Sequence, residues 1–518
     1  MSNNNSLIKS AGLIGFATVC SRILGFIRDI VIAKFFGTGI FAEAFFVAFR
    51  IPNLLRELVG EGAANAAFVP VFTEYLVQKD KTQLERLIQT MFKILFLVLS
   101  TIVVVGFFFS SPLVKLIAPG FVIDPAKFSL TVRLTQIMFI YLLFIGLTAY
   151  LMSILHTFKH FFTPAFGPCL LNISLIFSAI FFFSKLKEPV YSLAIGVLLG
   201  GAMQFAIQIH PLFRKKISFC LFSHSLHFTD PGVKKIFKLL LPRLFGSAVY
   251  QLNVFVDTIC ASLAKITGIG AVAAIYYANR IIQFPLAVFG IALSTVILPS
   301  LSHAYSSNNF EKLSRTLILS LRMIILFLLP CTIFLFVLSR PIVCIFFERG
   351  NFSSYSTSIT SWTLLFYCFG LIFYGGTKIL ISGFHSLQDT KTPVKIASIC
   401  LLINLCLNLI LMFPLKVGGI ALASSISSSV NFFILFYLLK KRIKSLEFKG
   451  LFIFFLRVLL LGLLCGMIAY SAWNFFFVSI LQILRLIICG ILASLSFFIG
   501  CVILKIKEVN LLWGLKGF

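Results

Sequence analysis

Charged residues are scarce in this sequence of 518 residues: Asp, Glu, Lys and Arg together make up 12% of the chain, whereas hydrophobic residues make up 59%. A soluble domain could not enclose so much apolar surface in one core. Acidic residues are the scarcest, with 16 Asp and Glu against 44 Lys and Arg. The composition excludes an ordinary soluble domain and predicts an integral membrane protein.

Patterns that hold metals or disulfides are missing as well. The 12 Cys residues are scattered along apolar segments without a C-x-x-C pair, so neither a disulfide framework nor a zinc site is indicated. The seven His residues lie at or near predicted helix ends or in loops, with no H-E-x-x-H motif and no paired carboxylates around them. We therefore expect no catalytic metal site.

Long apolar segments are what the sequence has in abundance. Crossing the hydrocarbon layer of about 30 Å takes roughly 20 apolar residues per helix. The first segment carries Arg22, Arg28 and Asp29 and no basic stretch precedes it, so we expect a membrane helix and not a cleaved signal peptide. Hydropathy predicts an all-α polytopic membrane protein of about fourteen helices, over residues 11–35, 42–66, 90–110, 130–155, 163–183, 191–210, 236–264, 272–302, 316–338, 357–383, 393–413, 418–439, 451–473 and 480–504.

The net charge of +28 is typical of two classes of protein, those that bind nucleic acids and those that follow the positive-inside rule. If the N-terminus is cytoplasmic, most Lys and Arg of the loops fall on the cytoplasmic side, for example in residues 79–93, 212–238 and 440–449. An even number of helices with both termini inside is the simple arrangement that gives so strong a bias. We therefore expect cytoplasmic termini and no nucleic-acid partner.

An internal repeat runs through the first twelve predicted helices. Ser153, His156, Thr163 and Pro164 recur as Ser382, His385, Thr392 and Pro393, each 229 residues later, and Pro70 and Pro299 are separated by the same number. The order and spacing predict two copies of a six-helix lobe, and an even shift in helix number keeps their orientation the same. The last two helices have no counterpart. We thus predict an N-lobe at 1–211, a cytoplasmic linker at 212–235, a C-lobe at 236–440 and, at 441–518, two further helices with a cytoplasmic tail.

Charged residues within the predicted membrane helices give the strongest functional signal. Burying an Arg at bilayer depth costs at least about 2.5 kcal/mol on insertion scales, so such residues usually face a cavity or a partner. In the first helix Ser21 and Arg28 are seven residues apart and share a face. The candidate set is Ser21, Arg22 and Arg28 in the first helix, Glu43, Arg50, Asn53 and Arg56 in the second, and Arg280 in the eighth.

Two interpretations of this set stay open. The arginines pair with carboxylates of the same helices, Asp29, Glu43, Glu57 and Glu61, or some of them are kept for a ligand. The cations slightly outnumber these carboxylates, and a guanidinium binds phosphate through two parallel hydrogen bonds while keeping its charge. A cavity lined by several arginines would suit a diphosphate.

A second polar group lies in the later helices. Asn253 and Asp257 are four residues apart in one helix, Asn404 and Asn408 are four apart in another, and Ser424 lies in the next. Oxygen ligands with a single carboxylate suit a hard monovalent cation such as Na⁺. Hydrogen bonds between helices explain the same residues equally well. We take Asp257, Asn404, Asn408 and Ser424 as a hypothetical Na⁺ site.

Several specific motifs follow one another along the chain, at 21–29 (SRILGFIRD), 44–56 (AFFVAFRIPNLLR), 61–63 (EGA), 118–121 (APGF), 164–172 (PAFGPCLLN), 276–280 (YYANR), 347–350 (FERG) and 389–393 (DTKTP). Together they resemble a known family, the MurJ (MviN) lipid II flippases. The resemblance follows nearly the whole chain in order. It implies the fold of the multidrug/oligosaccharidyl-lipid/polysaccharide exporter superfamily, with two six-helix lobes around a cationic cavity and two helices that form a groove for a lipid tail.

The resemblance also implies a function in peptidoglycan biosynthesis. The substrate would be lipid II, the undecaprenyl-diphosphate-linked disaccharide-pentapeptide, moved across the bacterial cytoplasmic membrane by alternating access without covalent chemistry. Arg22, Arg28, Arg56 and Arg280 would be essential cavity arginines, with Ser21 beside them. The implied partners are lipid II, membrane lipids and the cell-wall synthesis machinery.

Other functions agree less well with the residues of this sequence. An exporter of another polyprenyl-diphosphate-linked oligosaccharide, of the O-antigen type, would need similar arginines and stays an alternative. A drug exporter for cations should present acidic cavity residues instead. A membrane enzyme acting on polyprenyl diphosphates would need a cluster of His and carboxylates or a D-x-D metal site, and the sequence has neither.

Overall fold

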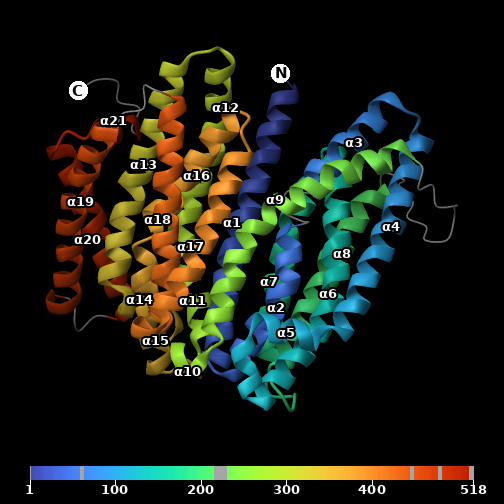
Figure 1. The fold of residues 1–518 in the computed structure, drawn as a ribbon, viewed down its shortest axis with the longest axis horizontal. Coiled ribbons are helices and arrows are strands. Elements are labelled where there is room, and N and C mark those ends of the chain that lie inside the picture. Colours follow the sequence, from blue (N-terminus) through green and yellow to red (C-terminus); the bar gives the residue numbers. More distant parts are fainter. Residues whose placement is uncertain (1, 59–63, 215–229, 444–447, 477–480, 513–518) are drawn as a thin grey trace. The chain divides into compact units, whose positions relative to one another are not determined.

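The computed structural model describes residues 2–58, 64–214, 230–443, 448–476 and 481–512. Within these ranges the chain is helical, with short turns between the helices and no β-strand (Figure 1). The predicted all-α fold class is confirmed. Most of the predicted linker at 212–235, together with Glu61, lies outside the described residues.

The chain forms two compact units. Unit 1 comprises Met1–Leu263 together with Arg349–Phe352, and unit 2 comprises Ala264–Glu348 together with Ser353–Phe518. The helix that follows the predicted linker therefore packs in unit 1, and a four-residue segment from the second half of the chain does so too. The division into lobes at 211 and 236 stays a prediction from the sequence.

Unit 1 is built around one long buried helix, α6 (Pro125–Thr157), which packs against α2, α3, α4 and α8. Asp124 begins this helix by accepting hydrogen bonds from the backbone N–H groups of Ala126 and Lys127. Helix α1 lies mainly on α7, and α9 mainly on α3. The other bounds are α1 (Ser2–Phe36), α2 (Ile40–Leu58), α3 (Ala64–Gln78), α4 (Lys81–Phe108), α5 (Ser110–Ile117), the 3₁₀ turn η2 (Pro119–Ile123), α7 (Phe162–Phe182), α8 (Tyr191–Arg214) and α9 (Pro231–Ala261).

Unit 2 has its apolar core between α12, α13, α16, α18 and α19. Leu313, Leu317 and Phe384 are fully buried there. The bounds are α10 (Ala264–Thr267), α11 (Ala271–Pro285), the π-helical segment η3 (Leu286–Ile291), α12 (Ala292–Ser306), α13 (Phe310–Val337), α14 (Ser339–Phe347), α15 (Ser354–Cys368), α16 (Leu371–Ser386), α17 (Lys391–Leu415), α18 (Val417–Arg442), α19 (Phe448–Ser471), the π-helical segment η4 (Ala472–Phe476), α20 (Gln482–Ile503) and α21 (Lys507–Leu512).

The predicted repeat is visible in the turns that follow α6 and α16. Lys159 and Gln388, which are 229 residues apart, both adopt the left-handed conformation, with φ of 57° and 59°. Each donates its backbone N–H to the carbonyl of the histidine three residues earlier, His156 at 2.9 Å and His385 at 3.0 Å. The two copies therefore end one helix and begin the next with the same local geometry.

A side-chain contact repeats with the same spacing. The Ser153 hydroxyl of α6 donates to Asn65 Oδ1 of α3 at 3.1 Å, and the Ser382 hydroxyl of α16 donates to the carbonyl of Ser294 of α12 at 3.2 Å. Ser153 and Ser382 are 229 residues apart, and so are Asn65 and Ser294. Corresponding helices of the two repeats are thus joined at corresponding positions, which confirms the repeat.

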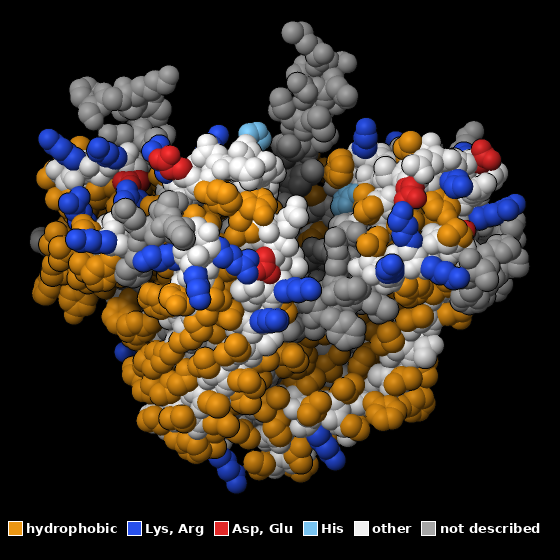
Figure 2. All heavy atoms as spheres, turned by 45° about the horizontal axis from the view of Figure 1, so that its top comes forward, with side chains coloured by type: hydrophobic (Ala, Val, Ile, Leu, Met, Phe, Trp, Pro, Cys, Tyr) orange, Lys and Arg blue, Asp and Glu red, His pale blue; other side chains and the backbone are white. Residues whose placement is uncertain are grey.

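Ten of the described helical segments are long and apolar enough to cross a membrane, or up to 11 if the bent pair α15 and α16 is one span. The remaining predicted spans fall on α1, on α2 with α3, and on α9, so the prediction of about fourteen spans is consistent with the structure. Side chains such as Ile487, Leu495 and Ile499 of α20 are more than half exposed, as expected for a surface in contact with lipid. Figure 2 shows hydrophobic side chains along the sides of the helices and Lys and Arg mainly at one end of them.

Candidate functional site

The predicted site residues are divided between the two units. Unit 1 holds Ser21, Arg22 and Arg28 on α1, Glu43, Arg50, Asn53 and Arg56 on α2, and Asp257 on α9. Unit 2 holds Arg280 on α11, Asn404 and Asn408 on α17, and Ser424 on α18. The arrangement of each group is described within its own unit.

Arg28 is the predicted arginine whose surroundings are described most fully. Its Nε and Nη2 donate to Asp29 Oδ1 at 3.0 and 2.7 Å, and its Nη1 donates to Asn172 Oδ1 at 3.0 Å. The Arg28 side chain is 12% exposed, and that of Asp29 is fully buried. The guanidinium is therefore held from two sides, by the carboxylate next to it in sequence and by a carboxamide of α7.

Asn172 also fixes α7 on α1. Its Nδ2 donates to the carbonyl of Ser21 at 3.1 Å, two helical turns before Arg28 on α1. The Cys169 thiol, one turn earlier on α7, lies 3.7 Å from the carbonyl of Ala17. The sequence analysis placed Ser21 and Arg28 on one face but did not single out Asn172. An Asn within the apolar segment 163–183 was the signal available, because a polar side chain at bilayer depth needs a partner.

The other predicted arginines differ in exposure. Arg22 is exposed, whereas Arg50, Asn53 and Arg280 are half-buried. Arg50, Asn53 and Arg280 each have at least one interaction partner. The backbone of Arg56 lies in α2, and the side chains of Arg56 and Glu57 lie outside the described part of the chain.

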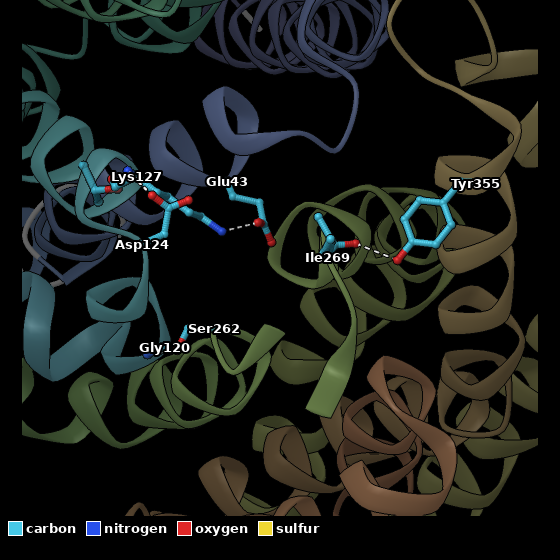
Figure 3. Close-up of polar contacts among 8 residues, drawn as sticks. Glu43, Gly120, Asp124, Lys127, Ser262, Ile269 and Tyr355 are labelled. Atoms are coloured by element: carbon cyan, nitrogen blue, oxygen red, sulfur yellow. Dashed lines mark hydrogen bonds and ion pairs between the residues drawn. The ribbon is translucent and has the colours of Figure 1, made fainter. Parts of the chain in front are cut away.

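Glu43 has a buried partner that the sequence analysis missed. Lys127 of α6 forms an ion pair with the Glu43 carboxylate, and both side chains are less than a tenth exposed (Figure 3). The Lys127 ammonium lies 3.8 Å from the centre of the Phe121 ring, a cation–π contact. Lys127 lies before the predicted span 130–155, so hydropathy did not include it in a helix. The structure places it in the first turn of α6, where it compensates the charge of Glu43.

The second predicted cluster forms in part within unit 2. Asn404 Nδ2 donates to the Ser424 hydroxyl at 3.2 Å, and Asn408 Nδ2 donates to Asn404 Oδ1 at 3.0 Å. All three side chains are buried between α17 and α18. Amide and hydroxyl oxygens are ligands that a hard cation accepts, so the residue types fit Na⁺. Asp257, the one predicted carboxylate ligand, is buried in α9 and belongs to unit 1.

A known family model matches most of the chain. The model described as "Lipid II flippase MurJ" matches residues 32–488. This range includes Glu43, Arg280 and the Asn404–Asn408 pair, and it begins four residues after Arg28.

Relatives are similar over nearly their whole length. The chain is 36% identical to a probable lipid II flippase MurJ of Buchnera aphidicola subsp. Schizaphis graminum, over 88% of this chain and 87% of the relative. It is 34% identical to the one of Buchnera aphidicola subsp. Acyrthosiphon pisum, over 98% and 99%. A lipid II flippase MurJ of Burkholderia cenocepacia is 36% identical over 88% and 89%.

Solved structures agree with the sequence comparisons. The chain matches the lipid II flippase MurJ in an inward closed conformation with a TM-score of 0.82 and 28% identity, over 96% of this chain and 99% of that chain. An inward-facing multidrug transporter of the MATE family, of the MOP superfamily, matches with a TM-score of 0.70 over 82% and 95%. Its sequence is 14% identical, so this likeness concerns the fold alone.

Proposed function

Because this chain belongs to the MurJ family of lipid II flippases, we propose that it carries lipid II from the inner to the outer leaflet of the bacterial cytoplasmic membrane. The membrane-spanning helices and the many exposed apolar side chains fit a multi-pass protein of that membrane. The substrate is recognised through its diphosphate, which is the part that must leave water on its way across the bilayer.

The orientation of Arg28 is the observation that carries the proposal. Arg28 donates to the Asp29 carboxylate next to it and to the Asn172 carboxamide of a second helix, so its guanidinium is held on two sides. A planar donor fixed on two sides has a defined orientation, and preorganisation of this kind lowers the ordering cost of binding a phosphate. We assign diphosphate binding to Arg28 in unit 1, and Arg280 in unit 2 keeps the substrate-binding role that the sequence predicts for it.

Transport by this chain needs no covalent step. The site opens in turn toward each leaflet, as in other transporters built from repeated lobes, while the lipid tail stays in the bilayer beside α19 and α20. An inside-negative membrane potential favours outward movement of an anion by about 2.3 kcal/mol per charge per 100 mV. We therefore propose a transporter and not an enzyme.

The topology follows from the loop charges. Lys440, Lys441 and Arg442 end α18, and Lys505 follows α20. Under the positive-inside rule these helix ends are cytoplasmic, and so are both termini. Contacts with the cell-wall synthesis machinery are the partner interaction that this location allows.

Na⁺ is the coupling ion that we propose. Asn404, Asn408 and Ser424 would supply neutral oxygen ligands from α17 and α18 within unit 2. The ligand role of the Asp257 carboxylate, which belongs to unit 1, stays a prediction from the sequence. The ion would link the outward movement of lipid II to the sodium gradient.

The test is complementation of a bacterium depleted of its own lipid II flippase, combined with a lipid II translocation assay in vesicles. We expect the parent chain to rescue growth, and Arg28→Ala and Arg280→Ala to reduce translocation about tenfold to a hundredfold, the size expected for losing hydrogen bonds between charged groups. Arg315→Ala is the matched control, because that side chain on α13 is 79% exposed. Failure of the parent to rescue, with translocation of an O-antigen-type lipid intermediate instead, would overturn the substrate assignment.

A further inference from the structure

We propose that Asn172 is a positioning residue for diphosphate binding: it aims the Arg28 guanidinium without neutralising it. This inference rests on the proposed function, because it concerns the arginine to which we assign the diphosphate. Asn172 lies 144 residues from Arg28 in the sequence and on a different helix, α7.

The geometry gives the two neighbours of Arg28 different tasks. Asp29 binds the Nε and Nη2 side of the guanidinium through one oxygen, at 3.0 and 2.7 Å. Asn172 binds Nη1 through its carboxamide oxygen at 3.0 Å. With contacts on Nε, Nη1 and Nη2, the plane of the guanidinium cannot turn about the end of its side chain without breaking a hydrogen bond.

The chemical type of the second ligand decides the local charge. Asp29 brings one negative charge to Arg28, so a carboxylate in place of Asn172 would bring a second and leave the group net negative. A carboxamide accepts the same hydrogen bond with no formal charge. The site therefore stays able to bind an anion, whereas two carboxylates would repel a diphosphate at close range in a medium of low dielectric constant.

The amide group of Asn172 has its own anchor. Its Nδ2 donates to the Ser21 carbonyl, which fixes the orientation of the carboxamide, so that the oxygen and not the nitrogen faces Arg28. The residue is 6% exposed. The Asn172 carboxamide thus joins the α1 backbone, through its nitrogen, to the Arg28 guanidinium, through its oxygen.

The experiment exchanges the two ligands of Arg28. Asn172→Asp gives two carboxylates, Asp29→Asn gives two carboxamides, and the double variant Asn172→Asp/Asp29→Asn restores one of each with the sides exchanged. The readouts are the Kd for undecaprenyl diphosphate, the KM and kcat of lipid II translocation, and the Tm of the full-length protein in detergent. All substitutions nearly preserve side-chain volume.

We expect Asn172→Asp to weaken diphosphate binding at least tenfold and to raise KM more than it lowers kcat. The double variant should recover most of that loss. A merely structural role of Asn172 would not produce this recovery. The single and the double variant both lack the hydrogen bond that the Asn172 Nδ2 donates to the Ser21 carbonyl, so they would then lose binding equally. No recovery in a double variant that folds would overturn the proposal.

Two further variants keep the proposal testable if Asn172→Asp fails to fold. In an Arg28→Ala background, Asn172→Ala should cause no further loss of diphosphate binding, whereas in the parent it should weaken binding about tenfold. Equal losses in both backgrounds would overturn the proposal.

Cys169→Ala is the matched control, because Cys169 contacts the α1 backbone from the same face of α7 without touching Arg28. We expect this variant to leave diphosphate binding within twofold of the parent. A parent chain that neither binds undecaprenyl diphosphate nor moves lipid II would refute the proposed function itself. The two results that would overturn only the role of Asn172 both require a parent chain that binds undecaprenyl diphosphate.

Discussion

Asn351, in the loop between α14 and α15, donates its backbone N–H to the carbonyl of Lys34 at 2.8 Å and thereby bonds to the last turn of α1, the helix that opens the first repeat. The corresponding loop of the first repeat does the same with α9, since Gly120 donates its N–H to the Ser262 hydroxyl at 3.1 Å. Figure 3 shows the Gly120 and Ser262 pair. Each repeat thus supplies a loop that bonds to the C-terminal end of the other repeat's first helix.

Both loops need glycine where they approach the helix end. Gly350 has a φ of +60°, and a Cβ at this position would lie 2.3 Å from the Lys34 carbonyl oxygen. We expect Gly350→Ala to lower the free energy of unfolding by at least about 1 kcal/mol, because the left-handed conformation and the overlap are both unfavourable for alanine. Thermal unfolding of the purified protein in detergent measures the effect as a lower Tm.

Gly15 of α1 provides the control for this substitution. A Cβ at Gly15 would have no heavy atom of the described structure within 4 Å. Alanine there should leave the Tm unchanged or raise it slightly, because alanine favours a helix over glycine by about 1 kcal/mol. If Gly350→Ala and Gly15→Ala behaved alike, the close approach of this loop to α1 would not exist in the folded protein.

The buried ion pair of Glu43 with Lys127 gives a second prediction. Glu43→Gln leaves the Lys127 ammonium buried without its carboxylate, which typically destabilises a protein by about 3 to 5 kcal/mol. We expect Glu43→Gln/Lys127→Met to recover part of this loss, because the double variant buries no uncompensated charge. Chemical unfolding with a denaturing detergent measures both variants.

An exposed ion pair serves as the comparison for Glu43. Glu311 and Arg315 pair on α13 with side chains 70% and 79% exposed. Glu311→Gln should change the free energy of unfolding by less than about 0.5 kcal/mol, as is usual for surface pairs. A similarly small effect of Glu43→Gln would mean that the Glu43 carboxylate reaches water and that the buried pair with Lys127 does not form.

Much of the fold could be predicted from hydropathy and spacing, and the exceptions have physical causes. The segment predicted at 272–302 is a span in the structure, but the π-helical segment Leu286–Ile291 interrupts it, and hydropathy does not register a change in hydrogen-bond pattern. The segment predicted at 236–264 is α9, yet no local pattern indicates that it packs in unit 1. Packing partners depend on side chains distant in sequence.

The candidate site shows the same limit at the level of single residues. Arg28 could be predicted because a charge at bilayer depth is costly wherever it lies. Its ligand Asn172 is 144 residues away, and Lys127 is 84 residues from Glu43. No spacing rule links such pairs, so the sequence indicated that the charges need partners but not which residues supply them.

Asp389 gives a prediction about pH. It lies in the turn before α17 and accepts hydrogen bonds from the backbone N–H and the hydroxyl of Thr392. It also forms an ion pair with Arg442 at 2.7 Å. Burial alone would raise the pKa of Asp389, but the hydrogen bonds from Thr392 and Arg442 outweigh it and lower the pKa from 3.8 to about 2. The folded state therefore favours the carboxylate, and its stabilisation is present above pH 3.8 and is lost as the pH falls toward 2.

We expect Asp389→Asn to lower the free energy of unfolding by about 1 kcal/mol between pH 5 and pH 8, because the partner Arg442 is 46% exposed and water screens the pair. The difference from the parent should shrink below about pH 4, because the unfolded parent then takes up a proton that the folded parent resists. Asp80→Asn is the control, since Asp80 precedes α4 without a capping hydrogen bond from its side chain. A constant difference from pH 3 to pH 8 would contradict the assigned role of the Asp389 charge.

The proposed Na⁺ site makes the last prediction, because a ligand that binds only the folded protein must stabilise it. At a Na⁺ concentration of 100 times the Kd the gain is about 2.7 kcal/mol. The parent should therefore have a higher Tm in NaCl than in an equal concentration of KCl. Asn404→Leu should abolish that difference, because it removes an oxygen ligand and the hydrogen bonds to Asn408 and Ser424. If Asn404→Leu lowers the Tm equally in both salts and the parent shows no preference for Na⁺, the three side chains only join α17 to α18. In that case Asp257, buried in the other unit, requires a different explanation.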